Sequence, residues 1–385
     1  MEEWIKCPLG DILNFRRGHD LPKTSMVPGD IPVAGSNGII GFHNVSTPIS
    51  PCITIGRSGN VGTPYIYDIC WAHNTVLYID DYKGNDPKYL YYLLKTLPLA
   101  SFGGGSAVPT LNRNHIHPME VIFCKDTELQ KKIAGILSKI DDKIELNRQI
   151  NDNLEQQAEA LYKSWFIDFE PFCEEEFIES SLGSIPTGWK VGQLSDVCEI
   201  VGGGTPSKNR PEYYCERGIA WLTPKDLSVS KSKFSSRGSE DITPEGYKNS
   251  STKLMPRGTV LFSSRAPIGY ISIATNEICT NQGFKSAVPG IAGTGYLYYF
   301  LKANTDKIES KASGSTFKEA SGALMKSLEI IIPADGILNQ FEAELAPILN
   351  KQENIASEIQ ALTTLRDTLL PKLMSGELKI NEIDC

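Results

Sequence analysis

The chain has 385 residues, 41% of them hydrophobic and 22% charged, which is enough for two globular domains and the structure that connects them. No apolar run approaches the length of a membrane span, and the N-terminus MEEWIKCPLG lacks the basic and apolar regions of a signal peptide. The nine cysteines include no Cys-x-x-Cys pair, which indicates free thiols in a reducing cytoplasm and argues against a disulfide framework or a zinc ribbon.

The net charge of −8 is distributed unevenly along the chain. Residues 1–125 are neutral, residues 126–185 carry −8, residues 186–333 carry +5, and residues 334–385 carry −5. A basic patch on one domain can bind phosphates while an acidic segment elsewhere sets the overall charge. The negative total therefore does not exclude a nucleic-acid partner.

The first 125 residues, which we call the first head, have a mixed pattern. Short β-rich runs such as Cys52–Ile55 alternate with turns rich in Gly, Pro, Asn and Ser. A helix then begins with Asp86 as N-cap and Pro87 at its first position, and Pro98 ends it. We expect its tyrosines to pack in or beside the core rather than to stack on bases, because the helix is regular and amphipathic.

A long helix is predicted to follow the first head. Apolar residues recur at alternating steps of four and three, which is typical of a coiled-coil seam, and the polar residues Asn147 and Asn151 interrupt them. About 40 helical positions would extend roughly 60 Å. The seam residues predicted here are Ile133, Leu137, Ile140, Ile144, Leu154 and Leu161.

The second half of the chain repeats the first. The helix Tyr89–Lys95 returns as Tyr296–Lys302 with six of seven residues identical, and the other shared segments keep the same order. The second head, residues 189–333, carries about 23 extra residues between Trp189 and Arg265. A second long helix follows, with polar interruptions at Gln352 and Arg366 and with the predicted seam residues Leu345, Ile348, Ile355, Ile359, Leu362 and Leu369.

The repeat predicts an α+β fold. Two similar mixed α/β heads would be separated by a long antiparallel coiled coil of two helices and related by a pseudo-two-fold axis. Two independent heads with separate helical tails remain an alternative. Pro347, placed near the start of the second helix, is tolerable there, and a kink of the first turn is left open. The expected boundaries are 1–125 for the first head, 126–172 for the first long helix, 173–188 for a linker, 189–333 for the second head and 334–378 for the second long helix.

The sequence lacks the motifs of a catalytic site. There is no Gly-x-x-x-x-Gly-Lys-Ser/Thr phosphate loop, no His-Glu-x-x-His pair and no Asn-Pro-Pro-Tyr methyltransferase loop. All five histidines lie in the first head, without acidic or cysteine partners at metal-ligand spacing. We therefore expect no catalytic residue, no metal site and no cofactor in this chain.

Glycine-rich loops with polar and basic residues recur in both heads. Arg, Lys, Asn, Ser and Thr side chains bind phosphates or base edges, and glycine lets a backbone approach a groove closely. Each loop could instead be an ordinary solvated turn, and Arg265 could form a salt bridge within its domain. The candidate DNA-binding residues are Arg16, Arg17, Asn37, Arg57, Ser58, Asn60, Ser106, Asn112 and Arg113 in the first head, and Lys208, Arg210, Thr223, Lys225, Arg265, Ser315, Thr316 and Lys318 in the second.

Four segments carry a family resemblance that covers essentially the whole chain. They are SWFIDFEPF (Ser164–Phe172), LGSIPTGWKVGQLSDV (Leu182–Val197), GGGTPSK (Gly202–Lys208) and LRDTLLPKLMSGELKI (Leu365–Ile380). In this order the chain resembles the specificity subunits of type I restriction–modification systems. One departure is Cys124, which stands where the second copy has Pro333 and which could shift the start of the first long helix.

The resemblance implies that each head is a target-recognition domain that reads one half of a bipartite DNA sequence. The paired helices would fix the spacing and dock two modification (methyltransferase) subunits, and restriction (helicase–nuclease) subunits would join through them. S-adenosylmethionine and ATP would belong to those partners, which would methylate adenine and cleave DNA in the cytoplasm, whereas this chain would catalyse nothing.

Two rival hypotheses remain from the residues alone. A coiled-coil scaffold with duplicated heads for a ligand other than DNA would suit the charge of −8 and the neutral first head. A stand-alone nuclease or methyltransferase is disfavoured by the absent motifs.

Overall fold

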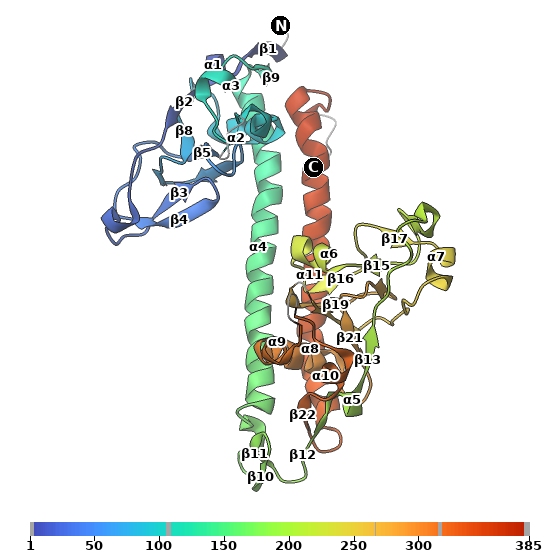
Figure 1. Ribbon diagram of the computed structural model, residues 1–385. Helices are drawn as coiled ribbons and strands as arrows, with labels where there is room; N and C mark the ends of the chain where they lie inside the picture. Colours follow the sequence, from blue (N-terminus) through green and yellow to red (C-terminus); the bar gives the residue numbers. More distant parts are fainter. Residues whose placement is uncertain (1–3, 105–108, 266, 315–317, 381–385) are drawn as a thin grey trace. The chain divides into compact units, whose positions relative to one another are not determined.

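The computed structural model describes residues 4–104, 109–265, 267–314 and 318–380, so the candidate residues Ser106, Ser315 and Thr316 lie outside the described residues. The chain forms two compact units. Unit 1 contains residues 1–146 and 359–385, and unit 2 contains residues 147–358, so the division falls inside both long helices (Figure 1).

The first head lies in unit 1 and is built around a four-stranded antiparallel sheet with the order β2-β8-β5-β6. A second sheet, β4-β3-β7, contains one parallel pair, and β1 pairs with β9. The elements are β1 Trp4–Pro8, α1 Leu9–Ile12, β2 Asn14–Arg17, η1 Lys23–Ser25, β3 Ile31–Gly35, β4 Gly38–His43, β5 Cys52–Gly56, β6 Pro64–Tyr67, β7 Trp71–Ala72, β8 Val76–Asp81, α2 Pro87–Thr96, η2 Leu99–Phe102, α3 Arg113–Ile116 and β9 Glu120–Cys124.

The second head lies in unit 2 and repeats this topology, with the order β13-β21-β18-β19 and an added edge strand, β16. The elements of the linker and the second head are η3 Glu170–Phe172, β10 Phe177–Ser180, β11 Gly183–Pro186, β12 Lys190–Gln193, α5 Leu194–Val197, β13 Cys198–Gly202, η4 Pro211–Tyr213, β14 Tyr214–Cys215, β15 Trp221–Leu222, α6 Pro224–Ser230, β16 Phe234–Ser235, β17 Asp241–Ile242, α7 Pro244–Lys248, β18 Val260–Ser264, β19 Ile268–Ala274, β20 Cys279–Thr280, β21 Lys285–Pro289, α8 Thr294–Ala303, α9 Thr305–Lys311, α10 Gly322–Lys326 and β22 Glu329–Ile332.

The strand register confirms the internal repeat. Pro8 pairs with Glu120 at one end of β1–β9, and Gln193 pairs with Glu329 at the corresponding end of β12–β22. The parallel pair β3–β7 likewise returns as β15–β20. The two heads are therefore two copies of one fold.

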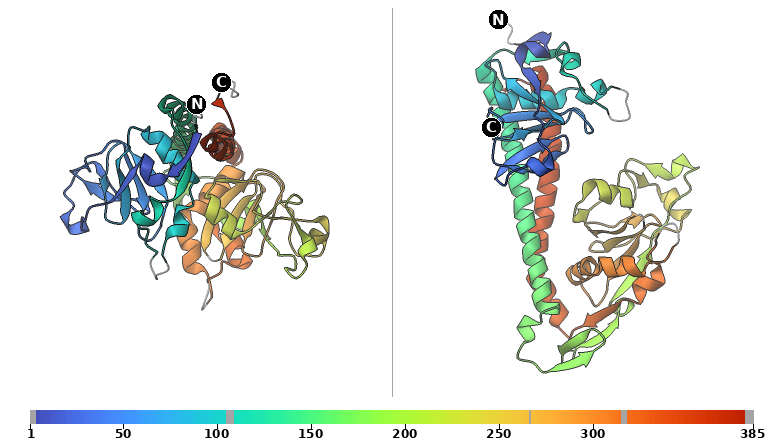
Figure 2. Two further views of the ribbon diagram at one scale, coloured as in Figure 1. Left: turned by 90° about the horizontal axis from the view of Figure 1, so that it is seen from above. Right: turned by 60° about the vertical axis from the view of Figure 1, so that its left-hand side comes forward.

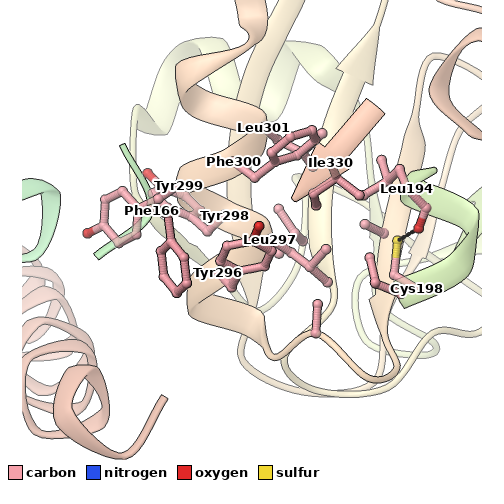
Figure 3. Packing of buried hydrophobic residues seen from close by; sticks show 14 of the residues in the cluster. Phe166, Leu194, Cys198, Tyr296, Leu297, Tyr298, Tyr299, Phe300, Leu301 and Ile330 are labelled. Carbon is pink, nitrogen blue, oxygen red and sulfur yellow. Dashed lines mark hydrogen bonds between the residues drawn. The ribbon is translucent and has the colours of Figure 1, made fainter. Parts of the chain in front are cut away.

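The repeated tyrosine helices α2 and α8 lie in the cores of their heads, as predicted. Asp86 caps α2 by accepting a hydrogen bond from the backbone nitrogen of Tyr89, and the side chains of Tyr89 and Tyr296 are fully buried. Figure 3 shows Tyr296 beside Phe166, with the two ring centres 4.6 Å apart. Burial of such large rings contributes much of a core's stability.

The departure at Cys124 has a local explanation. The hydroxyl of Tyr89 accepts a hydrogen bond from the backbone nitrogen of Cys124 at 3.1 Å. Pro333 has no N–H to donate, and the hydroxyl of Tyr296 donates instead to the carbonyl oxygen of Ile331. The following helices begin three residues after Cys124 and four residues after Pro333, so the two residue types shift the helix start by only one position.

The two long helices are α4, Thr127–Phe166 with 40 residues, and α11, Ile337–Ser375 with 39 residues. In unit 1, Ile133 and Leu137 near the start of α4 share a core with Leu373 near the end of α11. In unit 2, Trp165 at the end of α4 contacts Phe341 near the start of α11, with ring centres 5.7 Å apart. The helices therefore run antiparallel within each unit, which excludes separate helical tails (Figure 2).

None of the twelve predicted seam residues is exposed. Five are buried and the others are partly buried, so each unit encloses most of the apolar stripe. The buried residues are Ile133, Leu137, Ile144, Leu345 and Ile355, and the partly buried ones are Ile140, Leu154, Leu161, Ile348, Ile359, Leu362 and Leu369.

Pro347 does not lie in the first turn of the second long helix. The helix begins at Ile337, so Pro347 lies well inside it, and α11 continues through this residue. Pro347 is exposed, as is Ala343 four residues earlier, so the carbonyl that loses its intrahelical partner faces solvent.

No helix among the described residues is long and apolar enough to cross a membrane. In the same part of the chain, no group of three or more His, Cys, Asp or Glu side chains is arranged to hold a metal ion.

Candidate nucleic-acid interface

In unit 1, loops from distant parts of the first head meet at one edge of the sheet, which we call edge 1. The loop after β5 is joined to the loop before β8, because the backbone nitrogens of Arg57 and Ser58 donate to the carbonyl of Thr75 at 2.8 and 3.2 Å. Asn74 donates from its side chain to Asp20, which follows β2. Leu111 donates to the carbonyl of Arg57 at 2.7 Å and brings in the segment before α3.

Four of the predicted residues present exposed side chains around edge 1. Arg16 and Arg17 end β2, and Arg17 forms an ion pair with Asp20 at 3.5 Å. Asn37 lies in the turn between β3 and β4, and Asn60 accepts a hydrogen bond from Thr63 at 3.1 Å. These side chains are free to contact a ligand or are held only by surface interactions.

Other predicted residues of the first head hold the loops in place. Arg57 donates to the carbonyl of Asn74 at 3.3 Å, and Arg113 donates to the carbonyl of Phe15 at 3.0 Å. Asn112 caps α3 by accepting from the backbone nitrogen of Asn114. Ser58, which is half-buried, forms a β-bridge with Thr110.

Unit 2 contains the same arrangement, which we call edge 2. Thr205 and Gln282 are hydrogen-bonded as Asp20 and Asn74 are in unit 1. The backbone nitrogen of Ser264 donates to the carbonyl of Gly283 at 2.7 Å, and Ala320 donates to the carbonyl of Ser264 at 2.9 Å. These bonds correspond one by one to those of Arg57.

These hydrogen bonds show that Arg57 and Arg265 do not occupy the same position in the two heads. Ser264 occupies the position of Arg57, and Arg265 occupies the position of Ser58, because Arg265 bridges Glu319 as Ser58 bridges Thr110. In extended backbone a shift of one residue turns the side chain to the opposite face. The two arginines are therefore not equivalent, although sequence matching paired them.

A glycine at each edge is required by the close approach of two backbones. A Cβ atom on Gly18 would lie 2.1 Å from the carbonyl oxygen of His73, and one on Gly203 would lie 2.0 Å from that of Asn281. No other residue type fits at such distances. Both edges thus depend on the same contact between the loop after the first strand and the loop before the last strand of the sheet.

The predicted basic residues of the second head have acidic or aromatic neighbours. Lys208 pairs with Glu240 at 2.9 Å and lies 3.7 Å from the ring centre of Tyr214. Arg210 pairs with Glu212 at 2.8 Å. Arg265 pairs with Glu319 at 3.9 Å, the salt bridge within the domain that the sequence left open.

The remaining predicted residues of edge 2 differ in exposure. Thr223 and Asp226 form the capping box at the start of α6. Burial would raise the pKa of Asp226, but hydrogen bonds from Thr223 and Ser239 outweigh it, so the pKa is lowered. Lys225 is exposed and forms no ion pair within the described part of the chain. Lys318 is exposed, and its nitrogen lies 3.5 Å from the carbonyl of Glu309.

Asn37 and Lys225 occupy corresponding places in the two heads. Ala34 pairs with Ala72 in β3–β7, and Leu222 pairs with Thr280 in β15–β20, so the residues that follow correspond. In the first head the chain turns back as strand β4, whereas in the second it continues as helix α6. The same position thus presents an amide on a hairpin or an ammonium on a helix.

The sequence pattern did not identify the loop that precedes β8 in unit 1 or the loop that precedes β21 in unit 2. His73, Asn74 and Thr75 form it in unit 1, and Asn281, Gln282 and Gly283 form it in unit 2. Burial lowers the pKa of His73. The only available signal was a polar segment before a buried strand, which is common in loops.

Comparisons with known proteins agree with this architecture. The family model for the type I restriction modification DNA specificity domain matches residues 1–156 and 186–372, one copy for each half. The chain is 42% identical to the type I restriction enzyme MjaIX specificity subunit of Methanocaldococcus jannaschii over 42% of this chain and 38% of that protein. It is 28% identical to the HindI specificity subunit of Haemophilus influenzae over 66% of this chain and 68% of that protein.

A solved structure has the same fold. The crystal structure of the type I restriction–modification S subunit from M. genitalium matches with a TM-score of 0.67 over 96% of both chains, at 16% sequence identity. Two matches to the same family model, each spanning one head and most of one long helix, account for most of the sequence. The chain therefore belongs to the type I restriction–modification DNA specificity family, and its role is to specify a DNA sequence.

Proposed function

We propose that edge 1 and edge 2 each read one half of a bipartite DNA target. The observation that carries this proposal is that one loop framework is built twice and presents different side chains at corresponding positions. A protein that recognised the same half-site twice would need the same side chains at both edges. Asn37 against Lys225, and Ser58 against Arg265, predict two different half-sites.

The two long helices would hold the edges at a fixed spacing and dock two modification subunits. Restriction subunits would join through them, and S-adenosylmethionine and ATP would bind to those partners. The sequence lacks a methyltransferase loop, and we infer that the chemistry takes place in the partner chains and that the complex acts in the cytoplasm.

Methylation sequencing tests this proposal. The chain would be expressed with its modification subunit in a host without methylated adenine, and all modified sites would be read. A single bipartite motif with one fixed spacer length is expected. Methylation at unrelated sequences would contradict the proposal. So would the absence of methylation when the modification subunit is active.

A scaffold for a ligand other than DNA is the second candidate, favoured by the neutral first head. Titration with a duplex that carries the motif separates the two. Specific binding should weaken steeply with salt, because lysines and arginines that contact phosphates release counterions. Binding that does not depend on DNA sequence or salt would favour the scaffold.

A further inference from the structure

A carboxylate on α4 is bound from two sides in unit 2. The nitrogens of Lys233 and Lys302 in the second head lie 2.6 and 2.5 Å from the oxygens of Glu155. The hydroxyl of Tyr299 donates to the same carboxylate at 3.1 Å, and so does the amide of Gln352 on α11 at 3.1 Å. We call these five residues clamp 2.

Unit 1 contains a matching arrangement around Asp141, also on α4. The hydroxyl of Tyr92 donates to Asp141 at 2.8 Å, and Lys95 lies 3.9 Å away. Arg366 on α11 donates to the other oxygen at 2.8 Å. Tyr92, Lys95, Asp141 and Arg366 form clamp 1.

The two clamps use corresponding residues of the repeated helix. Tyr92 and Lys95 of α2 stand where Tyr299 and Lys302 stand in α8. In each copy the lysine also lies over the ring of the first tyrosine of the pair. Lys95 is 5.1 Å from the ring centre of Tyr91, and Lys302 is 5.9 Å from that of Tyr298. Core packing alone does not require a tyrosine hydroxyl and a lysine at these places, and each copy of the tyrosine helix uses them for a polar contact to α4.

Clamp 2 is largely withdrawn from solvent. The side chains of Glu155 and Lys233 are 22% and 12% exposed. Burial would raise the pKa of Glu155, but Lys233, Lys302 and Gln352 outweigh it and hold the pKa at about 2. Burial lowers the pKa of Lys233 to about 8, against the attraction of Glu155. A buried ion pair adds little net stability, but removing one partner leaves the other charge uncompensated.

We propose that Asp141 and Glu155 are positioning residues that set the orientation of each head on α4 and thereby restrict the spacing between the two DNA half-sites. The inference rests on the proposed bipartite recognition. The apolar core already packs each head on the helices, and a carboxylate with several directional donors adds a constraint on their relative orientation. The repeated tyrosine helix would then serve recognition without contacting DNA.

The test is a plasmid library in which the two half-sites are separated by the natural spacer or by spacers one and two base pairs shorter or longer. Glu155→Gln would be compared with Glu159→Gln, which carries the same change on the same helix at a residue that also pairs with Lys302 but is 48% exposed. We expect Glu155→Gln to raise methylation at altered spacers relative to the natural one by about tenfold, the effect of one lost charged hydrogen bond. Glu159→Gln should leave the ratio unchanged.

A second, milder pair of substitutions keeps the proposal testable if Glu155→Gln does not fold. Tyr299→Phe removes one hydroxyl of clamp 2, and Tyr298→Phe removes the neighbouring hydroxyl, for which the described residues provide no hydrogen-bond partner. Tyr299→Phe should relax the spacing in the same direction and leave the half-site sequences unchanged. Asp141→Asn against the exposed Asp142→Asn applies the same test to clamp 1.

Folded Glu155→Gln and Tyr299→Phe variants that keep the natural spacing ratio would overturn the proposal. Relaxed base preference within a half-site, with spacing intact, would also overturn it. Wild-type protein that shows no spacing preference at all would instead contradict the bipartite recognition on which the inference rests.

Discussion

The two heads share a framework and differ in what they place on it. Gly18 and Gly203 make the same close backbone contact, and the hydrogen bonds of Arg57 and Ser264 correspond, although these side chains are unrelated. At the position of Asn37 on a hairpin, the second head has Lys225 on a helix, and its extra residues add further elements. The comparison shows that backbone contacts define the edge, so its side chains can change independently.

The largest expected effect tests whether the framework is shared. Gly203→Ala should destabilise unit 2 by about 3 kcal/mol, because the new methyl group overlaps a backbone oxygen that cannot move away. Gly18→Ala should cost unit 1 a similar amount. Urea unfolding followed by tryptophan fluorescence would measure both.

Gly135→Ala is the control for these substitutions. Gly135 lies in α4, and a Cβ atom there would meet nothing within 4 Å, so helix propensity should make the change neutral or stabilising by up to about 1 kcal/mol. If only one of the two edge glycines tolerated alanine, the edges would not share one framework.

The clamps should differ in strength. Glu155→Gln leaves the buried Lys233 without a carboxylate, although Lys302 keeps its pair with Glu159 at 2.7 Å, and should cost about 3 kcal/mol in unit 2. Asp141→Asn should cost less, because Lys95 is more distant and Arg366 keeps its pair with Asp367 at 2.8 Å. Thermal unfolding of both variants would rank them, and an equal loss would show that the clamps are equivalent.

The same carboxylate predicts a pH dependence. Because the folded-state pKa of Glu155 lies near 2, below its ordinary value of 4.5, its contribution is fully present above about pH 4.5 and is lost as the pH falls toward 2. The groups that face it are Lys233, Lys302, Tyr299 and Gln352. The stability difference between wild type and Glu155→Gln should shrink as the pH falls below about 4.5.

The smallest expected effect concerns Lys225 and Asn37, two side chains proposed to contact DNA. Lys225→Ala should weaken binding at all salt concentrations and lower the slope of log affinity against log salt by about 1, as expected for one phosphate contact. Asn37→Ala should leave that slope unchanged, because an amide carries no charge. Fluorescence anisotropy with the methylation-defined duplex would measure both slopes.

Lys190→Ala is the control for charge alone, because Lys190 is exposed on β12, whose partner strand β22 lies outside the main sheet. A salt slope changed equally by Lys190→Ala and Lys225→Ala would show that Lys225 acts only through net charge. A changed slope in Asn37→Ala would contradict the proposed difference between the edges.

The sequence by itself determined the duplication, the α+β class and the burial of the tyrosines, because these follow from local periodicity and repeated motifs. It did not show how the helix accommodates Pro347, because an exposed proline inside a helix leaves the apolar periodicity unchanged.

The equivalence of Arg57 with Ser264, and the meeting of Tyr92 and Arg366 on Asp141, were decided only by the tertiary structure. The first depends on strand register, in which a shift of one residue reverses the direction of a side chain. The second joins three segments that are distant in the chain, and no local pattern encodes which buried charge another segment will neutralise.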